Sequence, residues 1–210
     1  LIAEAPTVAL WIAIIGVATA IGASIASFFQ ANFKKGIAYS TVAQLGYMFA
    51  AVGVGAPFPG LFHLFTHAAF KALLFLSAGV VIHGASNLEG LADLRGLGRF
   101  FPFSRAGFLI GSLALIGTPL ITAGSFSKDA IIDAALASST PVIGWLLLAA
   151  VILTGLYIGR LFTIVYVAPA PREAHVHHDA PSERLMNWSL IPLMIGSVIF
   201  GYFGNWLATA

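Results

Sequence analysis

The sequence predicts an all-α fold, a polytopic membrane bundle of about six transmembrane helices in which one helix is broken between Pro119 and Gly124. Two observations carry this prediction. Apolar residues make up 59% of the 210-residue chain and charged residues only 9%, whereas soluble domains carry about 25% charged residues. Apolar stretches of about 20 residues, the length that crosses a hydrocarbon core, recur along the chain, and no stretch alternates as β-barrel strands do.

The composition also excludes several classes of protein. A chain of 22.0 kDa with a mean hydropathy of +0.95 has too little polar surface to cover itself in water. This excludes a soluble enzyme, a disordered chain and a nucleic-acid-binding protein. The absence of cysteine excludes disulfides, thiolate metal sites and iron–sulfur clusters. The chain begins with Leu1 and shows no signal-peptide pattern, so we expect it to begin within a longer protein.

Six segments are expected to span the bilayer, and the basic residues between them predict their orientation. The expected segments cover residues 6–32, 37–55, 60–83, 105–137, 141–168 and 188–208. The three links on one side contain seven basic residues and the opposite links contain none. Because basic loops stay in the cytoplasm, we expect these three links to be cytoplasmic and both ends of the chain to face outward. The basic residues are Lys34, Lys35, Arg95, Arg99, Arg105, Arg172 and Arg184.

Three titratable residues share one face of the third expected segment. His63, His67 and Lys71 follow each other at intervals of four residues, which places them within roughly 80° of one another on a helix. A charge at membrane depth is costly unless it is paired or hydrated, so such residues indicate function. Two imidazoles and a buried lysine can exchange protons near neutral pH, and we expect a proton wire completed by water.

Three other interpretations of this stripe remain open. Buried histidines can simply hydrogen-bond between helices. Histidines four residues apart also suit zinc, although the glutamate of the metalloprotease pattern is missing and Lys71 would repel a cation. Lysine side chains can reach the interface from within a span, but Lys71 is expected near the middle of its segment.

The fourth expected segment carries the signals of a helix break. Gly117, Pro119 and Gly124 interrupt it, and proline deprives nearby carbonyls of their helical partners. Broken backbone at membrane depth survives only where protein or water satisfies it, and transporters place ion sites there. We expect Lys128 in the first turn of the second half, with Asp129 and Asp133 continuing a polar line toward the outer end. A simple packing kink, with Lys128 and Asp129 as an interfacial pair, is the alternative.

Other charged or titratable residues are less informative. Arg160 is expected to reach the cytoplasmic interface or to pair with a neighbour. His175, His177 and His178 fall in a Pro-rich, charged segment over residues 168–184. We expect this segment to be a solvated loop, although it could capture a metal ion.

Three motifs together resemble a known family. Residues 34–48 read KKGIAYSTVAQLGYM, residues 63–76 combine the His63, His67 and Lys71 stripe with ALLFL, and residues 127–129 read SKD. They closely resemble the subunit L family of bacterial NADH:quinone oxidoreductase (respiratory complex I), the distal antiporter-like subunits of its membrane arm. The corresponding subunit of Mrp-type cation/proton antiporters shares the stripe but differs in the flanking sequence. This chain departs from the subunit L pattern at Asn32-Phe33 and at Ser125-Phe126, outside the stripe.

The resemblance implies an architecture and a set of roles. The chain would form a single membrane domain over residues 1–210, in which residues 1–168 resemble the second of two inverted five-helix repeats and residues 188–208 form one further helix. The first repeat and a long lateral helix would lie outside this sequence. His63, His67 and Lys71 would belong to a central hydrophilic axis for proton transfer. Lys128, followed by Asp129, would lead protons outward.

The resemblance also implies partners and cofactors. We expect no cofactor and no metal on this chain, because it lacks cysteines, a phosphate-binding glycine loop and a flavin fingerprint. NADH, FMN, iron–sulfur clusters and quinone would be held by partner subunits. The expected partners are the other membrane-arm subunits of complex I, notably the neighbouring antiporter-like one, and lipids of the bacterial inner membrane. A structural module without its own conduction and a component of an Mrp-type sodium/proton antiporter remain alternatives.

Overall fold

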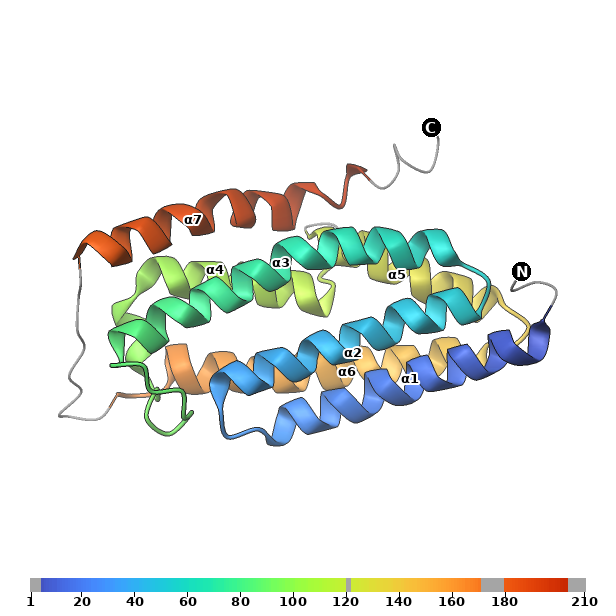
Figure 1. Ribbon diagram of the computed structural model, residues 1–210, viewed down its shortest axis with the longest axis horizontal. Coiled ribbons are helices and arrows are strands. Elements are labelled where there is room, and N and C mark those ends of the chain that lie inside the picture. Colours follow the sequence, from blue (N-terminus) through green and yellow to red (C-terminus); the bar gives the residue numbers. More distant parts are fainter. Residues whose placement is uncertain (1–4, 120–121, 171–179, 204–210) are drawn as a thin grey trace.

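A computed structural model describes residues 5–119, 122–170 and 180–203. Long helices run side by side along the molecule (Figure 1). A short 3-10 helix over Leu97–Phe100 precedes α4, and a π-helical stretch over Thr163–Val167 extends α6. The α-helices are α1 (Pro6–Phe29), α2 (Phe33–Gly53), α3 (Pro57–Gly84), α4 (Pro102–Ile116), α5 (Ala123–Ala137), α6 (Val142–Phe162) and α7 (Ala180–Ile199).

The predicted all-α class and the broken helix are confirmed. No strand occurs within the described ranges, and the fourth predicted segment is divided into α4 and α5, which are separated by residues 117–122. By length and composition, α1, α3 and α6 with its π-helical extension could each cross a membrane. α4 and residues Arg184–Ile199 of α7 form shorter apolar helices.

Two helices, α2 and α7, begin four or more residues earlier than the apolar pattern predicted. α7 begins at Ala180 rather than near residue 188, so the expected loop over 168–184 is wrong at its C-terminal end. Pro181 is compatible with this start, because the N–H groups of a first helical turn have no helical partner. α2 begins at Phe33 rather than residue 37, since the Asn32 side chain accepts a hydrogen bond from the Lys35 backbone N–H at 2.9 Å and caps the helix.

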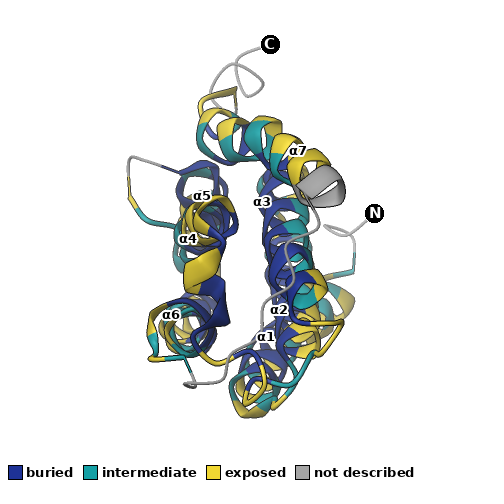
Figure 2. Cartoon of the chain, turned by 90° about the vertical axis from the view of Figure 1, so that its left-hand side faces the viewer, coloured by how far each residue is buried: buried dark blue, intermediate teal, exposed yellow. Residues whose placement is uncertain are grey.

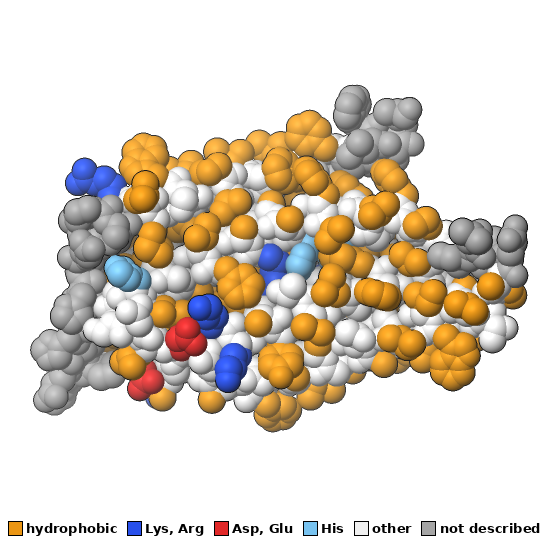
Figure 3. Space-filling view, in the orientation of Figure 1, with side chains coloured by type: hydrophobic (Ala, Val, Ile, Leu, Met, Phe, Trp, Pro, Cys, Tyr) orange, Lys and Arg blue, Asp and Glu red, His pale blue; other side chains and the backbone are white. Residues whose placement is uncertain are grey.

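The helices form two rows, and the core lies between them. Figure 2 shows α1, α2 and α3 in one row, α6, α4 and α5 in the other, and α7 across one edge. Buried residues line the facing sides of the rows and exposed residues line the outer sides. Hydrophobic side chains cover most of the face seen in Figure 3, while charged side chains gather toward the end where α1 meets α2. Such an outer surface is suited to lipid.

Small residues bring α1 and α2 into close contact. A Cβ atom at Gly16 would lie 2.4 Å from the Ala50 nitrogen, and one at Gly46 would lie 2.5 Å from the Ala20 nitrogen. Small residues at such positions let helix backbones approach in membranes, where packing replaces the hydrophobic effect as the main attraction. This contact fixes the position of α2, which supplies several side chains to the site.

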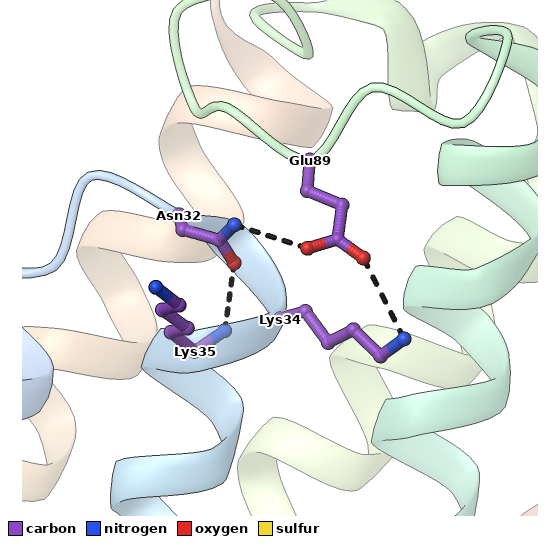
Figure 4. A network of polar contacts seen from close by, with 4 residues as sticks. All are labelled: Asn32, Lys34, Lys35 and Glu89. Atoms are coloured by element: carbon purple, nitrogen blue, oxygen red, sulfur yellow. Dashed lines mark hydrogen bonds and ion pairs between the residues drawn. The ribbon is translucent and has the colours of Figure 1, made fainter.

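Asn32, Lys34 and Glu89 form a polar cluster, which we call the latch, at one end of the bundle (Figure 4). The Asn32 amide donates to a Glu89 carboxylate oxygen at 3.0 Å, and the Lys34 ammonium lies 3.5 Å from the other oxygen. The Phe33 N–H also donates to the Glu89 backbone carbonyl at 2.8 Å. The latch therefore ties the start of α2 to the loop that follows α3.

The latch makes one pH-dependent prediction. The hydrogen bond from Asn32, assisted by the charge of Lys34, holds the pKa of Glu89 below its usual value of 4.5. A carboxyl whose pKa is lowered by folding stabilises the folded state above its ordinary pKa, and this contribution is lost as the pH falls through the lowered pKa. We expect Asn32→Ala to raise the pKa of Glu89, measured by ¹³C NMR titration of its carboxyl. An unchanged pKa in Asn32→Ala would show that the amide does not act on the carboxylate.

Candidate functional site

The predicted stripe on α3 lies inside the bundle. His63 is fully buried, and His67 and Lys71 are 6% and 5% exposed. The His63 and His67 rings lie 6.0 Å apart between centroids. The three residues therefore share one buried face, as their spacing predicted, and Lys71 does not reach an interface by extending along the helix.

His63 bridges three helices through both of its ring nitrogens. Nδ1 lies 2.9 Å from the Ser127 hydroxyl on α5, and Nε2 lies 3.1 Å from the Gln44 side-chain oxygen on α2. The Ser127 hydroxyl also lies 2.8 Å from the Thr66 hydroxyl. Both nitrogens are thus engaged in hydrogen bonds, which disfavours the zinc interpretation. No group of three potential metal-binding side chains occurs in the part of the chain that the structure describes.

Lys71 is held by neutral oxygen atoms. Its Nζ donates to the Ile37 carbonyl at 2.9 Å and to the Ser40 hydroxyl at 2.5 Å, and lies 5.6 Å from the centre of the Phe75 ring. Among the described residues no carboxylate forms an ion pair with it. A buried ammonium that has hydrogen-bond acceptors but no counter-charge is only partly compensated for its lost hydration.

The helix break places Lys128 against main-chain carbonyls. α4 ends at Ile116. The next residue, Gly117, has a φ of +88°, which lies in the left-handed region that glycine adopts without strain. The Lys128 Nζ donates to the Leu115 carbonyl at 2.5 Å and lies 3.5 Å from the Ile116 carbonyl. Both carbonyls belong to the last turn of α4, where helical partners are missing. The Lys128 side chain therefore satisfies backbone oxygens that the break leaves free.

Lys128 lies farther along its helix than expected. α5 begins at Ala123, so Lys128 belongs to its second turn and not to the first. The expected first-turn position is therefore wrong, and the repulsion between an ammonium and the positive helix end, which falls off within the first turn, does not act strongly on Lys128. Instead, the Lys128 Nζ lies 5.0 Å from the centre of the Tyr47 ring, and its side chain is 1% exposed.

Close backbone contact fixes the geometry of the break. A Cβ atom at Gly124 would lie 1.8 Å from the Ala114 carbonyl oxygen, so the first turn of α5 rests directly on α4. The Thr122 hydroxyl donates to the Thr118 carbonyl at 3.2 Å. The missing side chain of Gly124 thus allows the two half-helices to meet where Lys128 reaches across.

Some predicted residues lie away from this buried line. Asp129 and Asp133 are on the exposed face of α5, and the Lys128 ammonium turns to α4 rather than to Asp129. Arg160 is half-buried and donates to the Gln30 carbonyl at 3.0 Å, which confirms the expected pairing. The histidine tract at residues 175–178 lies outside the described residues.

Sequence reasoning missed several members of the site. Ser40, Gln44 and Tyr47 on α2 are fully buried and lie beside the predicted residues. Their spacing of four and three residues places them on one helix face, which is the signal that could have identified them. Tyr157, on α6, is also fully buried, but nothing in the sequence near it indicates a polar site.

Known proteins share this sequence over most of its length. Residues 1–156 match the family described as NADH:quinone oxidoreductase/Mrp antiporter, transmembrane. The chain is 43% identical over 208 residues to NADH-quinone oxidoreductase subunit L of Rickettsia conorii, which covers 96% of this chain and 30% of that protein. It is 40% identical over 206 residues to NADH-ubiquinone oxidoreductase chain 5 of Cryptococcus neoformans. This match covers 95% of this chain and 31% of that protein. The chain therefore spans less than a third of the length of these relatives.

Solved structures share the fold. A chain of the membrane-bound sulfane sulfur reductase, an archaeal respiratory membrane complex, superposes with a TM-score of 0.74 at 25% identity, over 90% of this chain and 39% of that one. A chain of respiratory complex I from Thermus thermophilus gives a TM-score of 0.74 at 23% identity, over 95% and 44%. The predicted resemblance to subunit L is thus confirmed, and the chain belongs to the NADH:quinone oxidoreductase/Mrp antiporter transmembrane family.

Proposed function

We propose that this chain is part of a proton-translocating membrane-arm subunit of an NADH:quinone oxidoreductase. One observation carries the proposal: Lys71 and Lys128 are buried within the bundle and held by neutral oxygens. Keeping two ammonium groups at such depth is costly, and a change of charge on each lysine is the function that accounts for it. His67 lies one turn before Lys71 on α3. Its ring lies 6.0 Å from that of His63, whose Nδ1 contacts the hydroxyl of Ser127, the residue next to Lys128.

In this mechanism, protons move from Lys71 to Lys128. Charge changes in partner subunits, driven by redox chemistry, alter the ionisation of Lys71. Its ammonium releases a proton, which passes through His67, His63 and water to the neutral amine of Lys128. Lys128 then releases a proton toward the outer end of α5, past the carboxylates of Asp129 and Asp133 on its exposed face. Each imidazole accepts a proton at one nitrogen and gives one up at the other, so both histidines keep their charge. A proton taken up from the cytoplasmic side then restores the ammonium of Lys71 and completes the cycle.

The same proposal covers the rest of the protein and its surroundings. Residues 1–168 would form the second inverted repeat, with residues 188–208 as a further helix. Other membrane-arm subunits, notably the neighbouring antiporter-like one, would be its partners. NADH, FMN, iron–sulfur clusters and quinone would reside on partner chains. The protein would lie in the bacterial inner membrane with its basic loops in the cytoplasm and both ends of this segment facing outward.

The proposal is tested by Lys71→Ala in the full-length protein, incorporated in the complex and reconstituted in liposomes. Loss of a positioned proton-transfer group slows such a step by about 10²–10⁴-fold, so we expect proton uptake per NADH oxidised to fall sharply. Proton uptake is measured with a pH-sensitive dye. Lys34→Ala, which removes an exposed lysine of the latch, should leave it unchanged. Normal uptake in Lys71→Ala would support a structural module instead.

A second candidate is supported by the family match itself, which includes Mrp antiporters. A sodium/proton antiporter would show proton flux that depends on sodium in the same liposomes. We expect the flux to be equal with sodium and with choline in the buffer. A flux that requires sodium would favour the antiporter.

A further inference from the structure

Gln44 is the one partner of His63 that cannot reverse its hydrogen bond by rotating a hydroxyl. Its oxygen lies 3.1 Å from Nε2 of His63, so in this orientation Nε2 carries the proton and donates. The ring then accepts at Nδ1 from the Ser127 hydroxyl, 2.9 Å away. The side-chain nitrogen of Gln44 is buried and has no hydrogen-bond partner.

Tyr157, on α6, lies close to the Gln44 side chain. Its hydroxyl is close to the side chains of Thr154, Ser40 and Gln44, is fully buried and also has no hydrogen-bond partner. The Thr154 hydroxyl is already engaged with the Ala150 carbonyl at 2.8 Å. Two side chains that each carry an unpartnered polar atom thus lie close together in the core, although buried polar groups are nearly always paired.

Turning the Gln44 amide by 180° would pair both groups. The amide nitrogen would then donate to Nε2 of His63, and the amide oxygen would accept from the Tyr157 hydroxyl. A glutamine side chain offers two donors at one end and an acceptor at the other, and the two ends are nearly equal in size. The turn therefore needs no extra volume, but it requires His63 to carry its proton on Nδ1 instead.

Proton transfer through a histidine requires such a reversal. When a neutral imidazole passes on a proton, an N–H bond forms at one nitrogen and another breaks at the other, so the ring ends in the opposite tautomer. Each neighbour must then change between donor and acceptor. Ser127 does so by rotating its hydroxyl, whereas the Gln44 amide does so only by turning.

We propose that Gln44 is a tautomer switch for His63, and that Tyr157 stabilises its turned state. Both are positioning residues, because they act through His63 and do not themselves carry the proton. The inference rests on the proposed function, since a switch of tautomer matters only if protons cross His63. Beyond the proposed function, the inference requires that both orientations of the Gln44 amide be accessible.

The test compares Gln44→Glu, Gln44→Met and Tyr157→Phe in the full-length protein within the reconstituted complex. A carboxylate presents only acceptors and a thioether presents no donor, so each change at Gln44 removes the turned state. Loss of one hydrogen bond of this kind corresponds to about a tenfold change in rate, and we expect proton uptake to slow by about that factor in all three variants. Tyr166→Phe is the matched control, because Tyr166 is a buried tyrosine that bonds Ser104, away from this line.

A second measurement reads the switch directly. Solid-state ¹⁵N NMR of histidine-labelled complex, with the His63 signal identified from a His63→Asn difference spectrum, should show both neutral tautomers in the unchanged protein. Gln44→Glu should leave only the form with the proton on Nε2, and Tyr157→Phe should raise its share. A purely structural role for Gln44 would not move these signals.

The outcomes separate this inference from the proposed function. Normal proton uptake in both Gln44 variants, or a single His63 tautomer in the unchanged protein, would overturn the switch. If Lys71→Ala still abolishes uptake in that case, the proposed function stands and only the switch fails. If Lys71→Ala also pumps normally, the proposed function itself fails.

Discussion

Lys128→Ala is expected to abolish proton uptake and to loosen the helix break at the same time. The Lys128 Nζ donates to the Leu115 carbonyl at 2.5 Å, and an unpartnered buried carbonyl costs about 1–3 kcal/mol. Loss of the proton-transfer group slows its step by about 10²–10⁴-fold. The measurement is dye-detected proton uptake per NADH oxidised, together with the melting temperature of the assembled complex.

Lys128→Arg separates these two effects. Arginine can donate to the Leu115 carbonyl but does not release its proton in proteins, so we expect a near-normal melting temperature with proton uptake still lost. Lys35→Ala removes an exposed lysine of α2 and should change neither quantity. Proton uptake at the normal rate in Lys128→Arg would contradict the role of Lys128 as a carrier.

Gly124→Val is expected to be the most damaging change among the glycines of the break. A Cβ atom at Gly124 would lie 1.8 Å from the Ala114 carbonyl oxygen, and backbone atoms cannot move aside without displacing a whole helix. Overpacking of this kind costs about 1–3 kcal/mol. Because α5 must shift away from α4, Lys128 should also lose its hydrogen bond to Leu115, and proton uptake should fall with stability.

The control for Gly124→Val is a glycine with free space around it. A Cβ atom at Gly155 would meet no other atom within 4 Å, so Gly155→Val on α6 should leave assembly and melting temperature nearly unchanged. Both variants are compared by native gel electrophoresis and by thermal unfolding of the complex in detergent. A normal melting temperature in Gly124→Val would show that the half-helices do not need their close contact.

The sequence predicts the helices well because their apolar length is a strong signal. The break was also predictable, since Gly117, Pro119 and Gly124 are poor helix formers within about two turns of each other. The start of α7 was missed because Pro181, Ser182, Glu183 and Arg184 precede its apolar part. The length of an apolar run does not show how far a helix continues into polar residues. Lys128 was placed one turn too early because the exact start of α5 depends on its contact with α4.

The site was predictable only where its spacing repeats along one helix. His63, His67 and Lys71 recur every four residues, and the structure places all three inside. Tyr157 lies far along the chain from Gln44, so only packing brings the two together. The exposed position of Asp129 likewise depends on which face α5 turns toward its neighbouring helices. The motif SKD at residues 127–129 does not specify this face.

The contact between Lys128 and the Leu115 carbonyl couples electrical state to main-chain shape. Hydrogen bonds from a charged donor are about twice as strong as those between neutral groups. The hydrogen bond from Lys128 to the last turn of α4 therefore weakens whenever the Lys128 side chain becomes neutral. Each proton that leaves Lys128 would therefore weaken the hydrogen bond at the C-terminal end of α4, and each proton that arrives would strengthen it. A change of charge on one side chain is in this way converted into a change in the contact between the two half-helices.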